Sequence, residues 1–125
     1  MKGVPEVVDH LSRVGREAVR VPQPVFAEIA YGLERLPTSK RRADLQARFD
    51  LMCAELARAD WTDEVSRAFG RIKQVLERRG QRIEDFDAAI AAHALALDAT
   101  LVTANLKQMT RVPDLNVEDW LRPLR

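Results

Sequence analysis

Oxygen-bearing side chains interrupt the apolar pattern of this sequence in three places. The first is Glu28, the second is the pair Asp85 and Asp87, and the third is the pair Thr103 and Asn105. Carboxylate and amide oxygens are the ligands that hard cations such as Mg²⁺ and Mn²⁺ select. Carboxylates that crowd together repel one another, and a bound cation relieves that repulsion. These residue types therefore indicate a metal site if the fold brings them together.

Each of these features also has a purely structural reading. The helix dipole favours an acid in a first helical turn, which alone accounts for Asp85 or Asp87. Glu28 is also compatible with a solvated helix face, and residues 103–105 with a simple turn. His93 is expected to be a packed or solvated histidine rather than a ligand. The residues taken singly leave both readings open.

Helical periodicity dominates the segments that must position these side chains. Apolar residues recur at helical spacing over residues 4–14, 24–36, 39–56, 62–80 and 85–97. Thr38 and Thr62 are the expected N-caps of the third and fourth helices, and Gly80 is the expected stop of the fourth. Short β-branched or apolar stretches predict strands at 19–21, 57–61, 100–103 and 115–117.

Short strands that alternate with longer helices predict an α/β fold with a parallel sheet flanked by helices. Functional groups in such sheets gather at the carboxyl ends of strands and at the adjoining helix N-termini. Thr103 and Asn105 follow the best predicted strand, and Asp87 lies in a first helical turn. The two segments are therefore expected to share one oxygen-rich pocket.

Composition sets the broad class. The 125 residues suit one domain, and a hydrophobic content of 46% is typical of globular proteins. The formal net charge of +1 means that local patches, not overall charge, must attract any nucleic acid. The single cysteine, Cys53, cannot form an internal disulfide, and no apolar segment predicts a membrane span or an export signal. A cytoplasmic protein is expected.

Three motifs in order resemble those of PIN-domain proteins of the VapC toxin family. Residues 27–32 read AEIAYG, similar to the family's AE-(L/I)-x-x-G. Residues 87–92 read DAAIAA, similar to D-x-x-I-A-A, and residues 101–105 read LVTAN, similar to L-(V/L)-T-x-(N/D). The resemblance extends over about residues 4–112, which makes coincidence a poor explanation.

The resemblance implies a single domain, residues 1–125, with a three-layer α/β/α sandwich built on a small parallel sheet. It also implies a ribonuclease that uses Mg²⁺ or Mn²⁺. Glu28 and Asp87 then correspond to metal ligands, with Asp85 as a secondary candidate. Asn105 corresponds to a residue that orients a water on the metal, and Thr103 to one that supports a carboxylate or the phosphate.

The sequence departs from the family pattern in two places. The family begins with a strand that ends in D-(T/S)-(N/S), whose aspartate is a principal ligand, and residues 1–8 read MKGVPEVV instead. Asp9 does not stand at the matching position, and Gln108 occupies a later position that is often acidic. We expect that the first strand is missing, through a start codon set too far downstream or a truncation, and that nuclease activity is impaired.

The resemblance further implies an RNA substrate, a VapB-like antitoxin and a homodimer. Candidate apolar contact residues for a partner are Leu33, Leu36, Phe49 and Met52, although core packing accounts for them equally well. Two basic clusters read either as solvated helix faces or as an RNA track: Arg35, Lys40, Arg41, Arg42 and Arg48, and then Arg71, Lys73, Arg78, Arg79 and Arg82. The alternatives are a catalytically inactive PIN-fold interaction protein and, less favoured, an unrelated helical adaptor.

Overall fold

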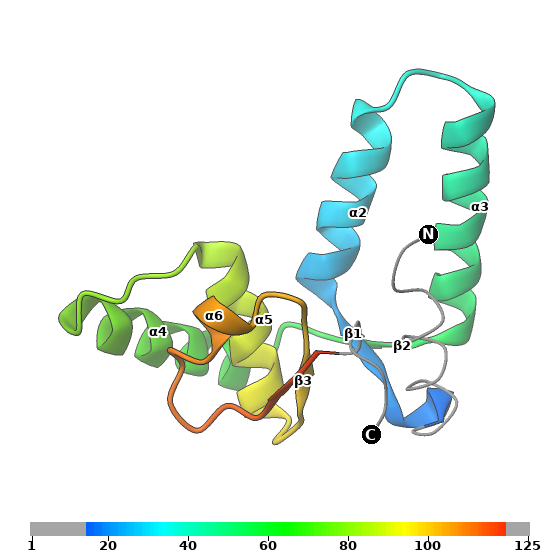
Figure 1. Ribbon diagram of the computed structural model, residues 1–125. Helices are drawn as coiled ribbons and strands as arrows, with labels where there is room; N and C mark the ends of the chain where they lie inside the picture. The colour runs from blue at the N-terminus through cyan, green and yellow to red at the C-terminus, as the bar shows by residue number, and fades with distance from the viewer. Residues whose placement is uncertain (1–14, 120–125) are drawn as a thin grey trace. The chain divides into compact units, whose positions relative to one another are not determined.

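The computed structural model describes residues 15–119, which fall into two units. One unit contains residues up to Asp60, and the other begins at Trp61. The helix expected at 4–14 lies outside the described residues. Both units combine helices with short strands (Figure 1). No helix within residues 15–119 has the length and apolar character that crossing a membrane requires.

The first unit consists of a helical hairpin that begins and ends at one parallel strand pair. Its elements are the 3-10 helix η1 (Arg16–Ala18), β1 (Arg20–Pro22), α2 (Gln23–Arg35), α3 (Lys40–Glu55) and β2 (Ala57–Ala59). Arg20 pairs with Ala57 and Pro22 with Ala59. Proline in the first turn of α2 leaves no hydrogen bond unmade, because the first N–H groups of a helix have no partner within it.

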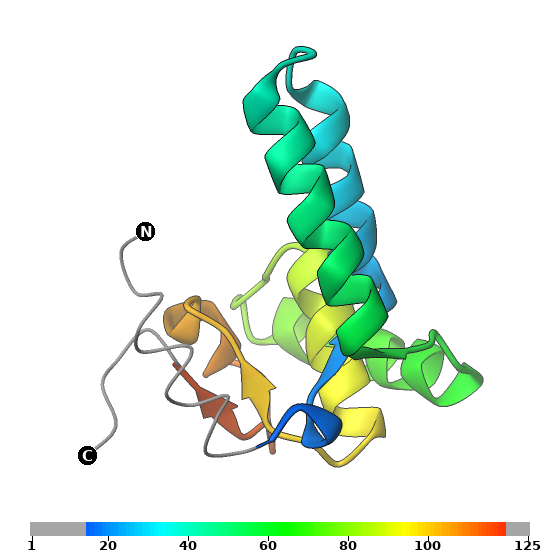
Figure 2. The same cartoon turned by 90° about the vertical axis from the view of Figure 1, so that its right-hand side faces the viewer.

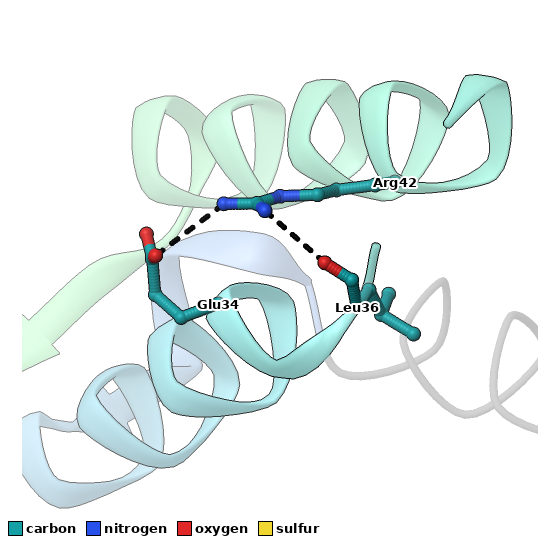
Figure 3. A network of polar contacts seen from close by, with 3 residues as sticks. All are labelled: Glu34, Leu36 and Arg42. Carbon is teal, nitrogen blue, oxygen red and sulfur yellow. Dashed lines mark hydrogen bonds and ion pairs between the residues drawn. The ribbon is translucent and has the colours of Figure 1, made fainter. Parts of the chain in front are cut away.

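Helices α2 and α3 lie side by side in both views (Figures 1 and 2). Phe26 and Phe49 pack across them with ring centroids 5.8 Å apart. Arg42 connects the hairpin near its loop, donating from Nη1 to the Leu36 carbonyl at 3.1 Å and placing Nη2 3.4 Å from Glu34 Oε2 (Figure 3). Because Glu34 is 78% exposed, the carbonyl bond is expected to matter more than the ion pair.

The N-cap of α3 differs from the sequence-based expectation. Ser39, not Thr38, occupies the cap position, and its hydroxyl accepts a hydrogen bond from the Arg42 backbone N–H at 3.1 Å. Both residue types cap helices well, so the sequence could not separate neighbours. The cap of the next helix was predicted correctly, because Thr62 Oγ1 accepts from the Val65 N–H at 3.3 Å.

The second unit contains α4 (Asp63–Arg78), α5 (Asp85–Ala96), β3 (Leu101–Val102), α6 (Leu106–Met109) and β4 (Val117–Glu118). Helix α4 buries one stripe against α5, namely Val65, Ala68, Ile72 and Leu76. Gly80 ends this segment with a φ of +67°, a conformation that favours glycine. Residues 88–94 of α5 are all buried, and their alanines allow close approach of neighbouring backbone.

Three of the four strands are shorter than expected, and the strands form two parallel pairs, β1–β2 and β3–β4, within the described residues. Leu101 pairs with Val117 and Val102 with Glu118. The α/β class and the small parallel sheet structure are confirmed. The organisation of residues 1–125 as one domain stays a prediction.

Candidate active site

The second unit brings two of the three polar motifs together. Asp87 lies in the first turn of α5, and Asn105 lies at the turn between β3 and α6. Asn105 Nδ2 donates to Asp87 Oδ2 at 3.3 Å, although the two residues are 18 positions apart. Thr103 Oγ1 accepts the Asn105 backbone N–H at 3.0 Å and so fixes the turn that presents the amide. Asp87, Thr103 and Asn105 are therefore connected by hydrogen bonds within this unit.

A depression of about 680 Å³ opens beside this pair. It is lined by charged and polar residues around one apolar side chain: Arg82, Ile83, Glu84, Asp85, Asp87, Asn105, Gln108 and Arg111. Asp85 lies at its edge with a carboxylate 3.0 Å from Lys73 Nζ. Asp85 already has a cationic partner and its side chain is 64% exposed, so it is a weaker candidate ligand than Asp87.

The carboxyl of Asp87 is in an unfavourable environment for negative charge. Burial raises its pKa above the ordinary aspartate value, and the nearby negative charge of Glu84 raises it further. Sequence reasoning missed Glu84, which stands at the N-cap position of α5 without a capping hydrogen bond from its side chain. Its position directly before α5, three residues ahead of Asp87, was a usable signal.

These side chains fit a hard divalent cation. A positive ion close to Asp87 would offset both causes of its raised pKa. Among residues 15–119, no three His, Cys, Asp or Glu side chains form a group able to hold a metal. Mg²⁺ nevertheless binds commonly through one or two carboxylates while it keeps several waters. Asp87, Glu84 and Asn105, which line one pocket, have the side-chain types that such a site uses.

Glu28 belongs to the other unit. It is an exposed residue of α2 within the motif at residues 27–32. Nothing in the geometry of its own unit assigns it a partner among the described side chains. Its role as a metal ligand together with Asp87 stays a prediction from the motif.

His93 is a packed residue, as expected. It is 1% exposed, and its Nδ1 lies 2.8 Å from the Ala89 carbonyl one helical turn earlier. The Trp61 ring meets the imidazole edge-on, with ring centroids 5.4 Å apart. His93 therefore supports the packing of α5 and does not face the pocket.

In α/β proteins with parallel strands, functional groups commonly lie at the carboxyl ends of the strands. The pocket here includes Asn105, which directly follows the end of β3. The sequence pattern of the PIN domain family matches residues 4–115. This chain belongs to the PIN domain family, in its VapC branch.

The relatives and solved structures agree with that assignment. Ribonuclease VapC2 of Rickettsia felis is 33% identical over 102 residues, covering 82% of this chain and 74% of the relative. Ribonuclease VapC2 of Haemophilus influenzae is 32% identical over 113 residues, covering 89% and 83%. The structure of VapBC2 from Rickettsia felis, bound to a DNA fragment from its promoter, matches with a TM-score of 0.77 at 31% identity, covering 90% of this chain and 81% of that one. The DNA-bound VapBC structure from Salmonella typhimurium shares the fold, with a TM-score of 0.83, 23% identity and coverage of 92% and 84%.

Proposed function

We propose that this chain is a ribonuclease toxin of a VapBC-type system and that it depends on Mg²⁺ or Mn²⁺. The observation that carries the proposal is the meeting of Asp87 and Asn105, from two separate motifs, at the edge of one polar pocket. Supporting it, the relatives that match over most of this chain are named as ribonucleases. The proposal includes a cytoplasmic location.

In this proposal, Asp87 and Glu84 hold the ion, together with Glu28 by virtue of its motif, and Asp85 contributes least. When bound, the ion would stabilise the negative charge that develops on a phosphate during hydrolysis. Asn105 orients the Asp87 carboxylate by donating a hydrogen bond to it. Thr103 fixes Asn105 by accepting its backbone N–H. The described side chains thus act mainly by positioning charge.

We make two further proposals, one about the binding partners and one about how tightly the ion is held and how fast RNA is cleaved. Solved structures similar to this chain include toxin–antitoxin complexes, so we propose a VapB-like antitoxin as partner and a homodimer as the toxin's own assembly. Gln108 lines the pocket without a charge, at a position that is often acidic in the family. We therefore propose that the pocket holds the ion weakly and that RNA cleavage is slow.

Substitution of Asp87 tests the proposal. Asp87→Asn removes the carboxylate charge while it keeps the size of the side chain. Removing a residue that only hydrogen-bonds to a metal ligand lowers metal affinity by about 10–100-fold, so removing a ligand itself is expected to lower it at least about tenfold. Mn²⁺ binding by calorimetry and cleavage of a labelled RNA pool should therefore both fall.

Asp85→Asn, on the same helical turn, is the matched control and should cause a much smaller loss, because Asp85 is largely exposed and already pairs with Lys73. Equal Mn²⁺ affinity in the Asp87→Asn and wild-type proteins contradicts the proposed site. A wild-type protein that binds Mn²⁺ but cleaves no RNA favours the non-catalytic interaction protein instead.

A further inference from the structure

The pocket has basic residues as well as acidic ones. Arg82 and Arg111 line it together with three carboxylates, Glu84, Asp85 and Asp87. Asp85 forms an ion pair with Lys73 at 3.0 Å, and the other charged groups of the lining are two carboxylates and two guanidinium groups. Neither basic residue belongs to any of the three sequence motifs.

The guanidinium of Arg111 is fixed at this site by the backbone. Its Nη1 donates to the carbonyl of Arg82 at 3.1 Å, a bond between residues 29 positions apart. The acceptor is a neutral carbonyl, so this bond leaves the positive charge of Arg111 intact. It also uses only one of the five N–H donors that an arginine carries. Arg111 itself is half-buried, whereas Arg82 is exposed.

An RNA phosphate approaching Asp87 and Glu84 meets negative charge. Attraction therefore requires positive groups on the same pocket. A guanidinium suits this task because its planar fork can donate two parallel hydrogen bonds to a phosphate. A half-buried arginine that is already hydrogen-bonded to the backbone, as Arg111 is to the Arg82 carbonyl, loses less conformational freedom on binding than an exposed arginine.

We propose that Arg111 binds a backbone phosphate of RNA in this pocket, next to Asp87, and that the Arg82 carbonyl holds it in place. The proposal rests on the proposed ribonuclease function for its choice of RNA. Arg111 then determines where the RNA backbone enters, and the carboxylates determine where the cation lies.

RNA binding in the presence of a chelator tests this without cleavage. A labelled single-stranded RNA is titrated by fluorescence anisotropy at several salt concentrations. Each phosphate contact contributes about 0.7 to the slope of log affinity against log salt for single strands. Arg111→Gln keeps an N–H donor for the Arg82 carbonyl but has no charge, so the slope should fall by about 0.7. Arg111→Lys keeps the charge and should keep the slope, with some loss of affinity because the fork is gone.

Arg67, an exposed residue of α4 outside the pocket lining and outside both basic clusters, is the matched control. Arg67→Gln should leave the slope unchanged. An unchanged slope in Arg111→Gln, an equal fall in Arg67→Gln, or no RNA binding by the wild type overturns the proposal.

A measurement on the unmodified protein covers the case in which Arg111→Gln does not fold. RNA should protect Arg111, and not Arg67, from an arginine-specific dicarbonyl reagent, as read by mass spectrometry; equal modification of both overturns the proposal. Cleavage with Mn²⁺ is scored separately. Cleavage with an unchanged Arg111→Gln slope removes only the role of Arg111, whereas a reduced slope without any cleavage removes only the nuclease function.

Discussion

Asp87 combines partial burial with a close negative neighbour, and both raise its pKa. An aspartate with a raised pKa binds its proton more tightly in the folded protein than in the unfolded chain. Its contribution to stability is therefore fully present at low pH. It is lost as the pH rises from the unfolded aspartate value of about 3.9 through the raised folded value. Above that window, the charged Asp87 destabilises the metal-free protein.

Asp87→Asn should accordingly raise the melting temperature of the metal-free protein at neutral pH. The gain should disappear at pH values below the ordinary aspartate pKa, where the wild-type side chain is also neutral. Thermal unfolding in chelator, measured across this pH range, checks the sign. Asp44→Asn, an exposed aspartate of α3, is the control and should show no such gain. A lower melting temperature for Asp87→Asn at neutral pH would contradict the electrostatic account.

At the level of single residues, the sequence predicts the motif residues but not the other residues that line the pocket with them. Asp87, Thr103 and Asn105 were found because each interrupts an apolar pattern at an element boundary. Arg111 could not be found this way, because an arginine after a short helix looks like any solvated residue. Its place at the pocket follows from its bond to the Arg82 carbonyl, and that contact exists only in three dimensions.

Element boundaries depend on single hydrogen bonds, and α3 gives a direct test of one. Ser39 caps this helix by accepting from the Arg42 N–H, while Thr38 precedes the cap. Loss of a capping hydroxyl typically costs about 1 kcal/mol. Ser39→Ala should therefore lower the free energy of unfolding by about 1 kcal/mol in a urea titration. Thr38→Ala should change it little, and a larger loss from Thr38→Ala would restore the original sequence-based cap.

The helices were predicted better than the strands for a physical reason. A helix such as α4 makes its own backbone hydrogen bonds and carries its signals locally, in the cap Thr62, the buried stripe and Gly80. A strand ends where its partner stops pairing, and the partner of β3 lies more than a dozen residues later in β4. The expected strand at 100–103 was therefore located correctly but is only Leu101–Val102.

Across the whole chain, the acidic motif residues are divided between the two units. Glu28 lies on α2, while Asp87 and Asn105 lie in the unit that begins at Trp61. The order of motifs along the sequence predicts that Glu28 shares one cation with Asp87. Metal affinities of variants of the intact protein can test whether the two carboxylates share one ion, without a measurement of the distance between them.

A double-mutant cycle provides the measurement. If Glu28 and Asp87 hold the same ion, Glu28→Gln and Asp87→Asn should each lower Mn²⁺ affinity, at least about tenfold for a ligand. The binding free energy lost by the double variant should be smaller than the sum of the losses of the two single variants. Once one ligand is gone the ion is already bound weakly, so removing the second ligand has less binding energy left to remove. Residues that do not interact give additive changes within about 0.5 kcal/mol. Asp44→Asn, also exposed and in the same unit as Glu28, should leave the affinity unchanged. Additive losses would indicate that the two carboxylates act on separate ions, and an unaltered affinity in Glu28→Gln would remove Glu28 from the site.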